Sequence, residues 1–296
     1  METNPTTHKI ERNFFHIPFF LPPEANVFQE RSVRFQELAA EDNSEWRHYL
    51  SLLAVLTAAQ QKILDVGGIR MPSRPYANTL LPEASEGEVP PDFYTVLHKI
   101  LQEVAGQISA EVESALQGLA ALPQQQAEAL AARVLKDEAQ DDDAPYKIWI
   151  HAALQVIWTA WAQGLTEDDV PPREERSICP CCGTDAVASV VLQKSDLHNL
   201  RYLHCPMCNS RWHALRAKCT FCGDQSGISL QEIEAQSGVL NGARAESCDK
   251  CHAYRKMVML TKQQYADPIA DDLASLTLDI LVGENGYRRG GGNPFL

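Results

Sequence analysis

Eight of the nine cysteines in this chain of 296 residues form four Cys-x-x-Cys pairs in its C-terminal part. The pairs are Cys179 with Cys182, Cys205 with Cys208, Cys219 with Cys222, and Cys248 with Cys251. Two cysteines at this spacing share one turn and offer two thiolates to one metal ion, and two such turns complete a tetrahedron. The four pairs therefore predict two tetrathiolate sites, each binding one metal ion.

Disulfide bonds and catalytic dithiols are the alternative uses of such pairs. Disulfides need an oxidising compartment and are typical of shorter, loop-rich chains. Residues 1–15 lack the basic and apolar regions of a secretory signal. No uninterrupted apolar run is long enough to span a membrane. We therefore expect a cytoplasmic protein with reduced thiols and no membrane insertion.

The order of the pairs along the chain predicts which of them share a metal ion. The first pair maps onto the third at an offset of 40 residues, and the second onto the fourth at an offset of 43, which indicates two similar modules in tandem. Each module then holds two consecutive pairs. Joining the two middle pairs instead would leave the outer pairs to close a long loop, at a larger cost in conformational entropy.

Other side chains near the pairs are candidates for supporting roles. Cys181 lies inside the first pair and cannot reach the same metal with the geometry of its neighbours, so we interpret it as a thiol that is not a ligand. His204, His213 and His252 lie near ligand cysteines. With eight cysteines available, we expect these histidines to be hydrogen-bond donors around the sites or surface groups.

The part of the chain before the cysteines reads as helical. Apolar residues recur at spacings of three and four in six segments. These segments are residues 25–40, 45–66, 92–104, 110–121, 124–135 and 146–165. The last carries Trp149, Trp158 and Trp161, and we expect it to be the central core helix. Residues 67–90 predict an extended loop, and the acidic residues 138–144 predict a solvated loop.

The composition changes at Pro171 and Pro172, which mark a linker. Beyond them, short β-rich runs alternate with the cysteine pairs, as in small hairpins where metal ligation replaces a core too small to fold alone. The runs are residues 187–192, 201–204, 212–215, 228–233 and 255–260. The expected fold is multidomain. It has a helical domain (1–175), two small β modules with four cysteines each (176–217 and 218–262), which the family resemblance given below implies to be rubredoxin-like or zinc-ribbon-like, and a C-terminal helix with a tail (263–296).

The C-terminal part has its own pattern. Residues 267–282 present an apolar helical face with acidic residues at its N-terminal end, where they suit the helix dipole. We expect this helix to pack onto the N-terminal domain, with partner binding as the alternative. The glycine-rich tail after Arg289 is flexible by composition.

Charge and motifs narrow the function. The chain has a formal net charge of −13. Residues 176–262 carry 11 Lys and Arg against 7 Asp and Glu, an excess that two tetrathiolate sites with divalent metals would neutralise. Nucleic-acid binding, which relies on neutralising phosphates, is therefore disfavoured. The sequence holds no Gly-x-Ser-x-Gly, no phosphate-binding glycine loop and no His-Glu-x-x-His motif. We expect a protein that acts through another protein and is not an enzyme.

The cysteine motifs and their surroundings resemble the FdhE family of formate dehydrogenase accessory proteins. The resemblance rests on Cys179-Pro-x-Cys182-Gly183, on the run from Leu200 through Cys205 and Cys208 to Trp212-His213, on Lys218-Cys219-x-x-Cys222-Gly223, and on Cys248-Asp-x-Cys251-His252. Residues 267–274 and the terminal Gly286-Tyr287-Arg288-Arg289 with Asn293-Pro294-Phe295 are also similar. Residues 184–186 and the three glycines at 290–292 depart from the family pattern, and neither departure touches a proposed ligand.

This resemblance implies two rubredoxin-like modules that hold two metal ions, with iron as the favoured metal. Spacing alone does not distinguish iron from zinc, because a tetrathiolate site suits both. The resemblance also implies that the protein binds the catalytic subunit of respiratory formate dehydrogenase before export. A zinc-ribbon nucleic-acid-binding protein and a small redox protein using Cys-x-x-Cys dithiols are the alternatives. A homo-oligomer is compatible with the sequence.

Overall fold

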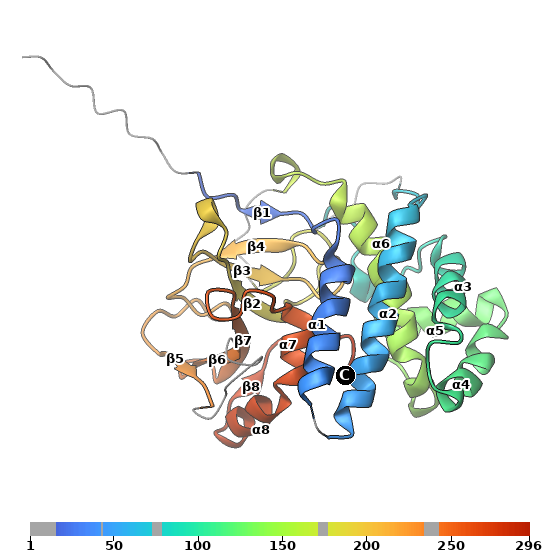
Figure 1. Cartoon of the computed structure of the whole chain (residues 1–296). Coiled ribbons are helices and arrows are strands. Elements are labelled where there is room, and N and C mark those ends of the chain that lie inside the picture. The colour runs from blue at the N-terminus through green and yellow to red at the C-terminus, as the bar shows by residue number, and fades with distance from the viewer. Residues whose placement is uncertain (1–15, 43, 73–78, 171–176, 234–242) are drawn as a thin grey trace, which may run out of the picture.

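The computed structural model describes residues 16–42, 44–72, 79–170, 177–233 and 243–296. A layer of helices packs beside a mixed β-sheet, and the last part of the chain returns to lie between the two (Figure 1). The helices of the N-terminal part are α1 (Val27–Glu41), α2 (Trp46–Val66), α3 (Phe93–Val104), α4 (Ala110–Ala120), α5 (Gln124–Leu135) and α6 (Lys147–Gln163). All six were predicted within three residues at either end.

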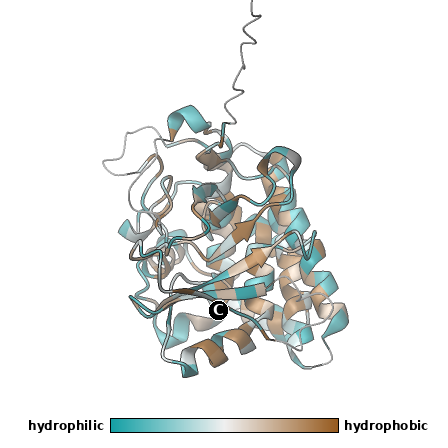
Figure 2. Cartoon of the chain, turned by 90° about the vertical axis from the view of Figure 1, so that its left-hand side faces the viewer, coloured by the Kyte–Doolittle hydropathy of each residue, from teal (hydrophilic) through white to brown (hydrophobic). Residues whose placement is uncertain are grey.

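Helix α6 is the centre of the helical layer. It is hydrophobic on all sides, as expected for a helix enclosed by others, and Ile150, Leu154 and Ile157 are fully buried. The three tryptophans of α6 are buried as well, which confirms that they pack in the core. Hydrophobic residues gather on the helices and on the central strands in Figure 2.

The β-sheet contains both cysteine modules. Its strands are β1 (Phe20–Leu21), β2 (Ala188–Val191), β3 (Arg201–His204), β4 (Arg211–Ala214), β5 (Ile228–Gln231), β6 (Ala243–Cys248), β7 (Ala253–Met259) and β8 (Arg288–Arg289). The order is β1-β4-β3-β2-β7-β6-β5, and β8 pairs with β7. Strands β2, β3 and β4 form the first half-sheet, and β5, β6 and β7 form the second. A parallel pairing of β2 with β7 joins the two halves.

The hydrophobic core differs from the prediction in the first half-sheet. We expected metal ligation to replace a core in each module. Instead the main core runs without a break from the helices to Val187, Leu203 and Trp212 and includes the cysteines of the first two pairs. The second half-sheet has only a small cluster of its own, formed by Ala245, Tyr254, Leu278 and Val282. The prediction is therefore wrong for the first half-sheet, and for the second it stays a prediction.

The C-terminal segment forms two short helices where one was expected. They are α7 (Pro268–Ala274) and α8 (Leu276–Glu284), and the chain turns between them at Ser275, which has φ −106° and ψ 33°. The Ser275 hydroxyl donates to the carbonyl of Asp271, and Lys256 contacts the Ser275 carbonyl. Helix α7 packs against α1 as expected, whereas α8 packs against β6.

The tail is packed, which corrects the expectation of a flexible end. Strand β8 pairs with β7, and the Asn293 side chain donates to the carbonyl of Ile269 and to the Asp272 carboxylate. Phe295 is 1% exposed and its ring meets that of Phe35 on α1. Composition suggested flexibility because glycines dominate the segment, but they allow close packing here. A side chain at Gly290 would overlap the ring of Phe221.

Two expected loops are partly structured. In the acidic stretch Asp141 and Asp142 are exposed, while Asp143 is buried and accepts two hydrogen bonds from Arg133. The expected loop at 67–90 contains one 3-10 turn, Ala84–Glu86, and its residues 73–78 lie outside the described ranges. The expected linker at 171–176 lies outside them too. Among the described helices, none combines the length and the apolar character that a membrane crossing requires.

Candidate metal centres

The first four-cysteine group consists of Cys179, Cys182, Cys205 and Cys208. The first two lie on the turn before β2, and the other two on the turn between β3 and β4. All four are fully buried. The Sγ atoms of Cys179 and Cys208 are 3.6 Å apart, and those of Cys182 and Cys205 are 3.4 Å apart.

The second four-cysteine group consists of Cys219, Cys222, Cys248 and Cys251. Its turns precede β5 and connect β6 to β7, so they repeat the placement of the first group. The Sγ atoms of Cys219 and Cys251 are 3.8 Å apart, and those of Cys222 and Cys248 are 3.7 Å apart. Within each group all four sulfurs lie within 4.8 Å of one another. The structure thus brings the consecutive pairs together, as the repeat predicted.

All four turns share one backbone geometry. In each, the N–H of the fourth residue after the first cysteine donates to the carbonyl of that cysteine, at 2.8 to 3.2 Å. That fourth residue is always in the left-handed region. The residues and their φ values are Gly183 (73°), Asn209 (57°), Gly223 (79°) and His252 (52°). Because L-residues are strained in this region, glycine at two of the positions follows from the turn itself.

The two groups fit a tetrahedral thiolate metal. A metal–sulfur bond of about 2.3 Å places tetrahedral sulfurs about 3.8 Å apart, close to the observed distances. All nine cysteines are free thiols. Burial raises the pKa of the Cys179 and Cys205 thiols well above its usual value. A metal ion that binds here would therefore displace their protons, which would couple metal binding to pH.

The structure places the remaining candidates in different surroundings. Cys181 is buried beside the first group and belongs to neither set of four, and its carbonyl accepts a hydrogen bond from the N–H of Leu81. His252 occupies the left-handed position of its turn. The ring of His213 packs edge-on against that of Tyr202. His204 takes part in a polar network beside the first group.

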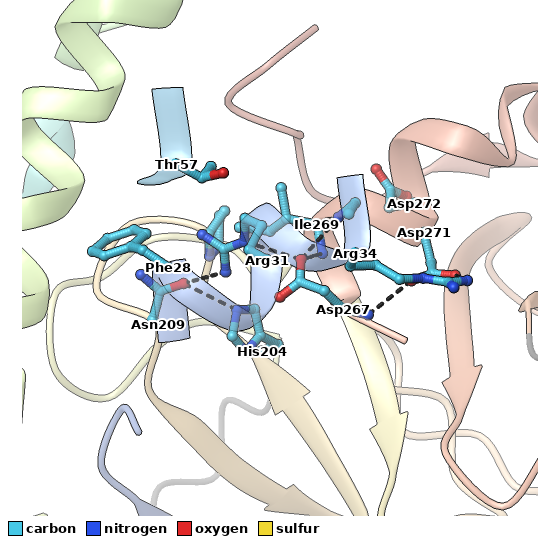
Figure 3. A network of polar contacts seen from close by, with 12 residues as sticks. Phe28, Arg31, Arg34, Thr57, His204, Asn209, Asp267, Ile269, Asp271 and Asp272 are labelled. Carbon is cyan, nitrogen blue, oxygen red and sulfur yellow. Dashed lines mark hydrogen bonds and ion pairs between the residues drawn. The ribbon is translucent and has the colours of Figure 1, made fainter. Parts of the chain in front are cut away.

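Asn209 is the centre of that network (Figure 3). Its Oδ1 accepts hydrogen bonds from Arg31 on α1 at 2.7 Å and from His204 Nε2 at 3.2 Å. Its Nδ2 donates to Thr159 on α6 at 2.8 Å. Burial lowers the pKa of His204 to about 3, so the ring is neutral. The residue that follows Cys208 is thus fastened to two helices of the N-terminal part.

Buried arginines extend the network to α7. Arg31 donates to Asp267 at 2.9 Å, and Arg34 donates twice to Asp271, at 2.9 and 2.6 Å. The sequence analysis missed both arginines. A signal was present, because Arg31 and Arg34 fall between Phe28 and Leu38 on the apolar stripe of α1.

The first group is also held from the loop between α2 and α3. The N–H of Ala84 donates to the carbonyl of Cys182, beside the hydrogen bond from the N–H of Leu81 to the carbonyl of Cys181. On the other side, Gln155 of α6 donates to the carbonyl of Pro206 at 2.6 Å. The helical part therefore supports both turns of the first group.

Two buried side chains connect the four-cysteine groups. Arg255 on β7 donates to the Asp185 carboxylate and to the Ala186 carbonyl, just after the first turn. Its guanidinium also lies 4.6 Å from the ring centroid of Phe221, a residue that stands between two cysteines of the second group. Arg201 on β3 forms a bidentate pair with Glu246 on β6, at 3.0 and 2.7 Å.

A helical N-terminal part fastened to a sheet with two tandem four-cysteine groups defines the class of this protein. Three family models match it along its length. The model of the FdhE N-terminal region matches residues 17–175, that of the FdhE central domain residues 178–216, and that of the FdhE C-terminal domain residues 217–296. The chain belongs to the FdhE family, as its motifs suggested, and the family name supports an accessory role in formate dehydrogenase formation.

Individual relatives agree over nearly the whole chain. The protein FdhE homolog of Pectobacterium carotovorum is 33% identical over an alignment that covers 95% of this chain and 91% of that one. The homolog of Pseudomonas aeruginosa is 32% identical and covers 94% of this chain and 93% of its own. The crystal structure of the FdhE protein from Pseudomonas aeruginosa superposes with a TM-score of 0.80 at 31% identity, covering 94% of this chain and 99% of that one.

Proposed function

We propose that this protein is a non-catalytic accessory factor for respiratory formate dehydrogenase that binds the catalytic subunit of that enzyme in the cytoplasm. Membership of the FdhE family supports the choice of enzyme. The pair of four-cysteine groups is the observation that carries the mode of action. A metal held by four thiolates has no open position for water or substrate, which favours docking or electron transfer over hydrolysis.

Each four-cysteine group is proposed to bind one metal ion through its four thiolates. Iron is favoured by the family resemblance, and zinc fits the same ligands. Bound iron would supply a one-electron couple to the maturation of the partner, whereas zinc would only stabilise the fold. The residues of this chain would in either case fix the four sulfurs and exclude water from the first group.

The proposed metal sites are tested by the metal content and the optical absorption of protein purified without oxygen or added metal. Two irons per chain, with thiolate-to-iron charge-transfer bands that bleach on reduction, are expected for rubredoxin-like sites. Two zincs and a featureless visible spectrum would assign both groups to structure. Less than one metal per chain after anaerobic purification would contradict the metal sites altogether.

A pull-down from cells that are making formate dehydrogenase tests the partner. The tagged chain is expected to retain the catalytic subunit, and Cys219→Ser, which removes one thiolate from the second group, is expected to weaken that capture. Cys181→Ser is the matched control, because this cysteine belongs to neither group. Absence of the catalytic subunit from the wild-type eluate would overturn the proposal.

The domain limits belong to the proposal as well. We propose units at residues 1–175, 176–217, 218–262 and 263–296. Limited proteolysis of the metal-loaded chain is expected to cut first near residue 175. Because the first half-sheet shares its core with the helices, we expect the two fragments to stay associated after this cut.

A further inference from the structure

The two four-cysteine groups differ in their access to solvent. Every cysteine of the first group has no exposed surface. In the second group, Cys219 and Cys248 are buried, Cys251 is partly exposed and Cys222 is exposed. Two sites with the same ligands and the same turns therefore present different surfaces to molecules in solution.

The surroundings of the two groups also differ, because the first group is enclosed more deeply than the second. The first group lies inside the main core, with α6 on one side and the loop that carries Leu81 and Ala84 on the other. The turns of the second group precede the edge strand β5 and connect β6 to β7, on the side of the sheet away from the helical layer (Figure 1), and its cysteines are absent from the main core. Opening the first site requires separation of the core, whereas the second needs only a local opening, which costs less free energy.

We propose that the second four-cysteine group is an exchangeable site for a thiophilic divalent metal, and that the first group keeps its metal as long as the fold persists. This rests on the metal binding proposed above. Exchange requires a ligand from solution to approach while one protein thiolate leaves and takes up a proton. Cys222 is the thiolate at which such an approach is sterically open.

The packing behind the second group sets how far it can open. Phe221 precedes Cys222 and is held between the guanidinium of Arg255 and the backbone of Gly290. Because a side chain at Gly290 would displace the Phe221 ring, Gly290→Ala is expected to loosen this turn without touching a ligand. Through the Phe221 turn, the tail thus limits exchange at the second group.

Zinc release to a chromogenic chelator tests the inference on the full chain loaded with two zinc ions. A chelator such as 4-(2-pyridylazo)resorcinol is added in excess, and its absorbance follows the zinc that leaves. We expect one zinc per chain to leave at least about tenfold faster than the other, in line with local against global opening. Cys222→Ser removes one thiolate of the second group, so this group should no longer retain zinc and only the slow phase should remain. Gly290→Ala should accelerate the fast phase and leave the slow phase unchanged.

Cysteine labelling supplies a readout that needs no variant. The zinc-loaded chain is treated with a thiol-alkylating reagent, and the modified positions are followed by mass spectrometry. Modification of Cys222 well before that of Cys179 or Cys182 supports the inference. Release of both zincs in one phase, or equal modification of both groups, would overturn it and leave the metal sites intact. Binding of fewer than two zincs would instead overturn the metal sites themselves.

Discussion

Single residues carry the turn geometry that the cysteine spacing alone does not specify. The eight cysteines and their grouping could be predicted because a Cys-x-x-Cys pair is a local pattern that repeats. Arg31 and Asn209 could not, because their partners are distant in sequence: Arg31 lies 178 residues from Asn209 and 236 residues from Asp267. A buried charge is stable only when such a partner arrives, and local patterns do not reveal it.

The left-handed glycine of a cysteine turn should affect zinc release, whereas a left-handed glycine outside these turns should not. Gly223→Ala places a side chain at φ 79°, and we expect it to lower the free energy of unfolding by about 1–2 kcal/mol and to speed zinc release. Gly286→Ala is the matched control, because Gly286 has φ 82° and lies outside the turns. It should cost a similar amount of stability and leave zinc release unchanged. Equal release rates for wild type and Gly223→Ala would contradict this role.

Replacing Asp267 should lower the stability of the fold more than replacing any other carboxylate of the buried network. Its Oδ1 accepts from Arg31 and from the N–H groups of Ile269 and Ala270 at the start of α7. Asp267→Asn removes the charge opposite buried Arg31, so we expect a loss of about 3–5 kcal/mol in urea unfolding. Asp168→Asn, at an exposed position, should change stability by less than about 0.5 kcal/mol.

The same carboxylate predicts a pH dependence. Burial alone would raise the pKa of Asp267, but Arg31 and the backbone N–H groups outweigh it and the pKa is lowered. A lowered pKa in the folded state gives stability that is complete above the unfolded value, near about 3.9, and is lost as pH falls below it. The difference between wild type and Asp267→Asn should therefore be constant from neutral pH down to about pH 5 and shrink in stronger acid.

At the scale of elements, the helices were predictable and part of the sheet was not. Helices of 11 to 21 residues repeat their apolar pattern over several turns, so the signal accumulates. Strand β6 escaped prediction because its residues, Ala-Arg-Ala-Glu-Ser-Cys, are small or polar. They are buried because β5 and β7 pair with β6 on both sides. The two-residue strands β1 and β8 likewise exist through pairing with distant strands.

The Arg201–Glu246 pair should hold the two half-sheets in register. The pair reaches from β3 to β6 across β2 and β7, and burial lowers the pKa of Arg201 and raises that of Glu246. We expect Arg201→Met or Glu246→Leu alone to cost about 3–5 kcal/mol, because one charge remains buried without its partner. The double variant should recover most of this loss. Additive losses in urea unfolding would show that the two side chains act independently.

The whole molecule is more unified than a string of modules. The sequence analysis predicted a helical part followed by a β part, and this order holds. It did not foresee that the core of the helical part would enclose the first four-cysteine group. Which faces meet depends on contacts between distant segments, and local periodicity carries no information about them. The tail shows this most clearly, because its composition is that of a loose end and its contacts reach both layers.

The tail should therefore act as a clasp between helices and sheet. Phe295 packs against Phe35 of α1, its carbonyl accepts a hydrogen bond from Tyr49 of α2, and β8 pairs with β7. Phe295→Ala is expected to lower the free energy of unfolding by about 3–5 kcal/mol, as for other buried aromatics. Leu296→Ala is the matched control, since the neighbouring Leu296 is 51% exposed, and it should cost less than about 0.5 kcal/mol. Urea unfolding followed by far-UV circular dichroism and by tryptophan fluorescence checks both values. If the clasp joins the two layers, both signals should shift together in Phe295→Ala, whereas a shift confined to one signal would mean that the tail stabilises only one layer.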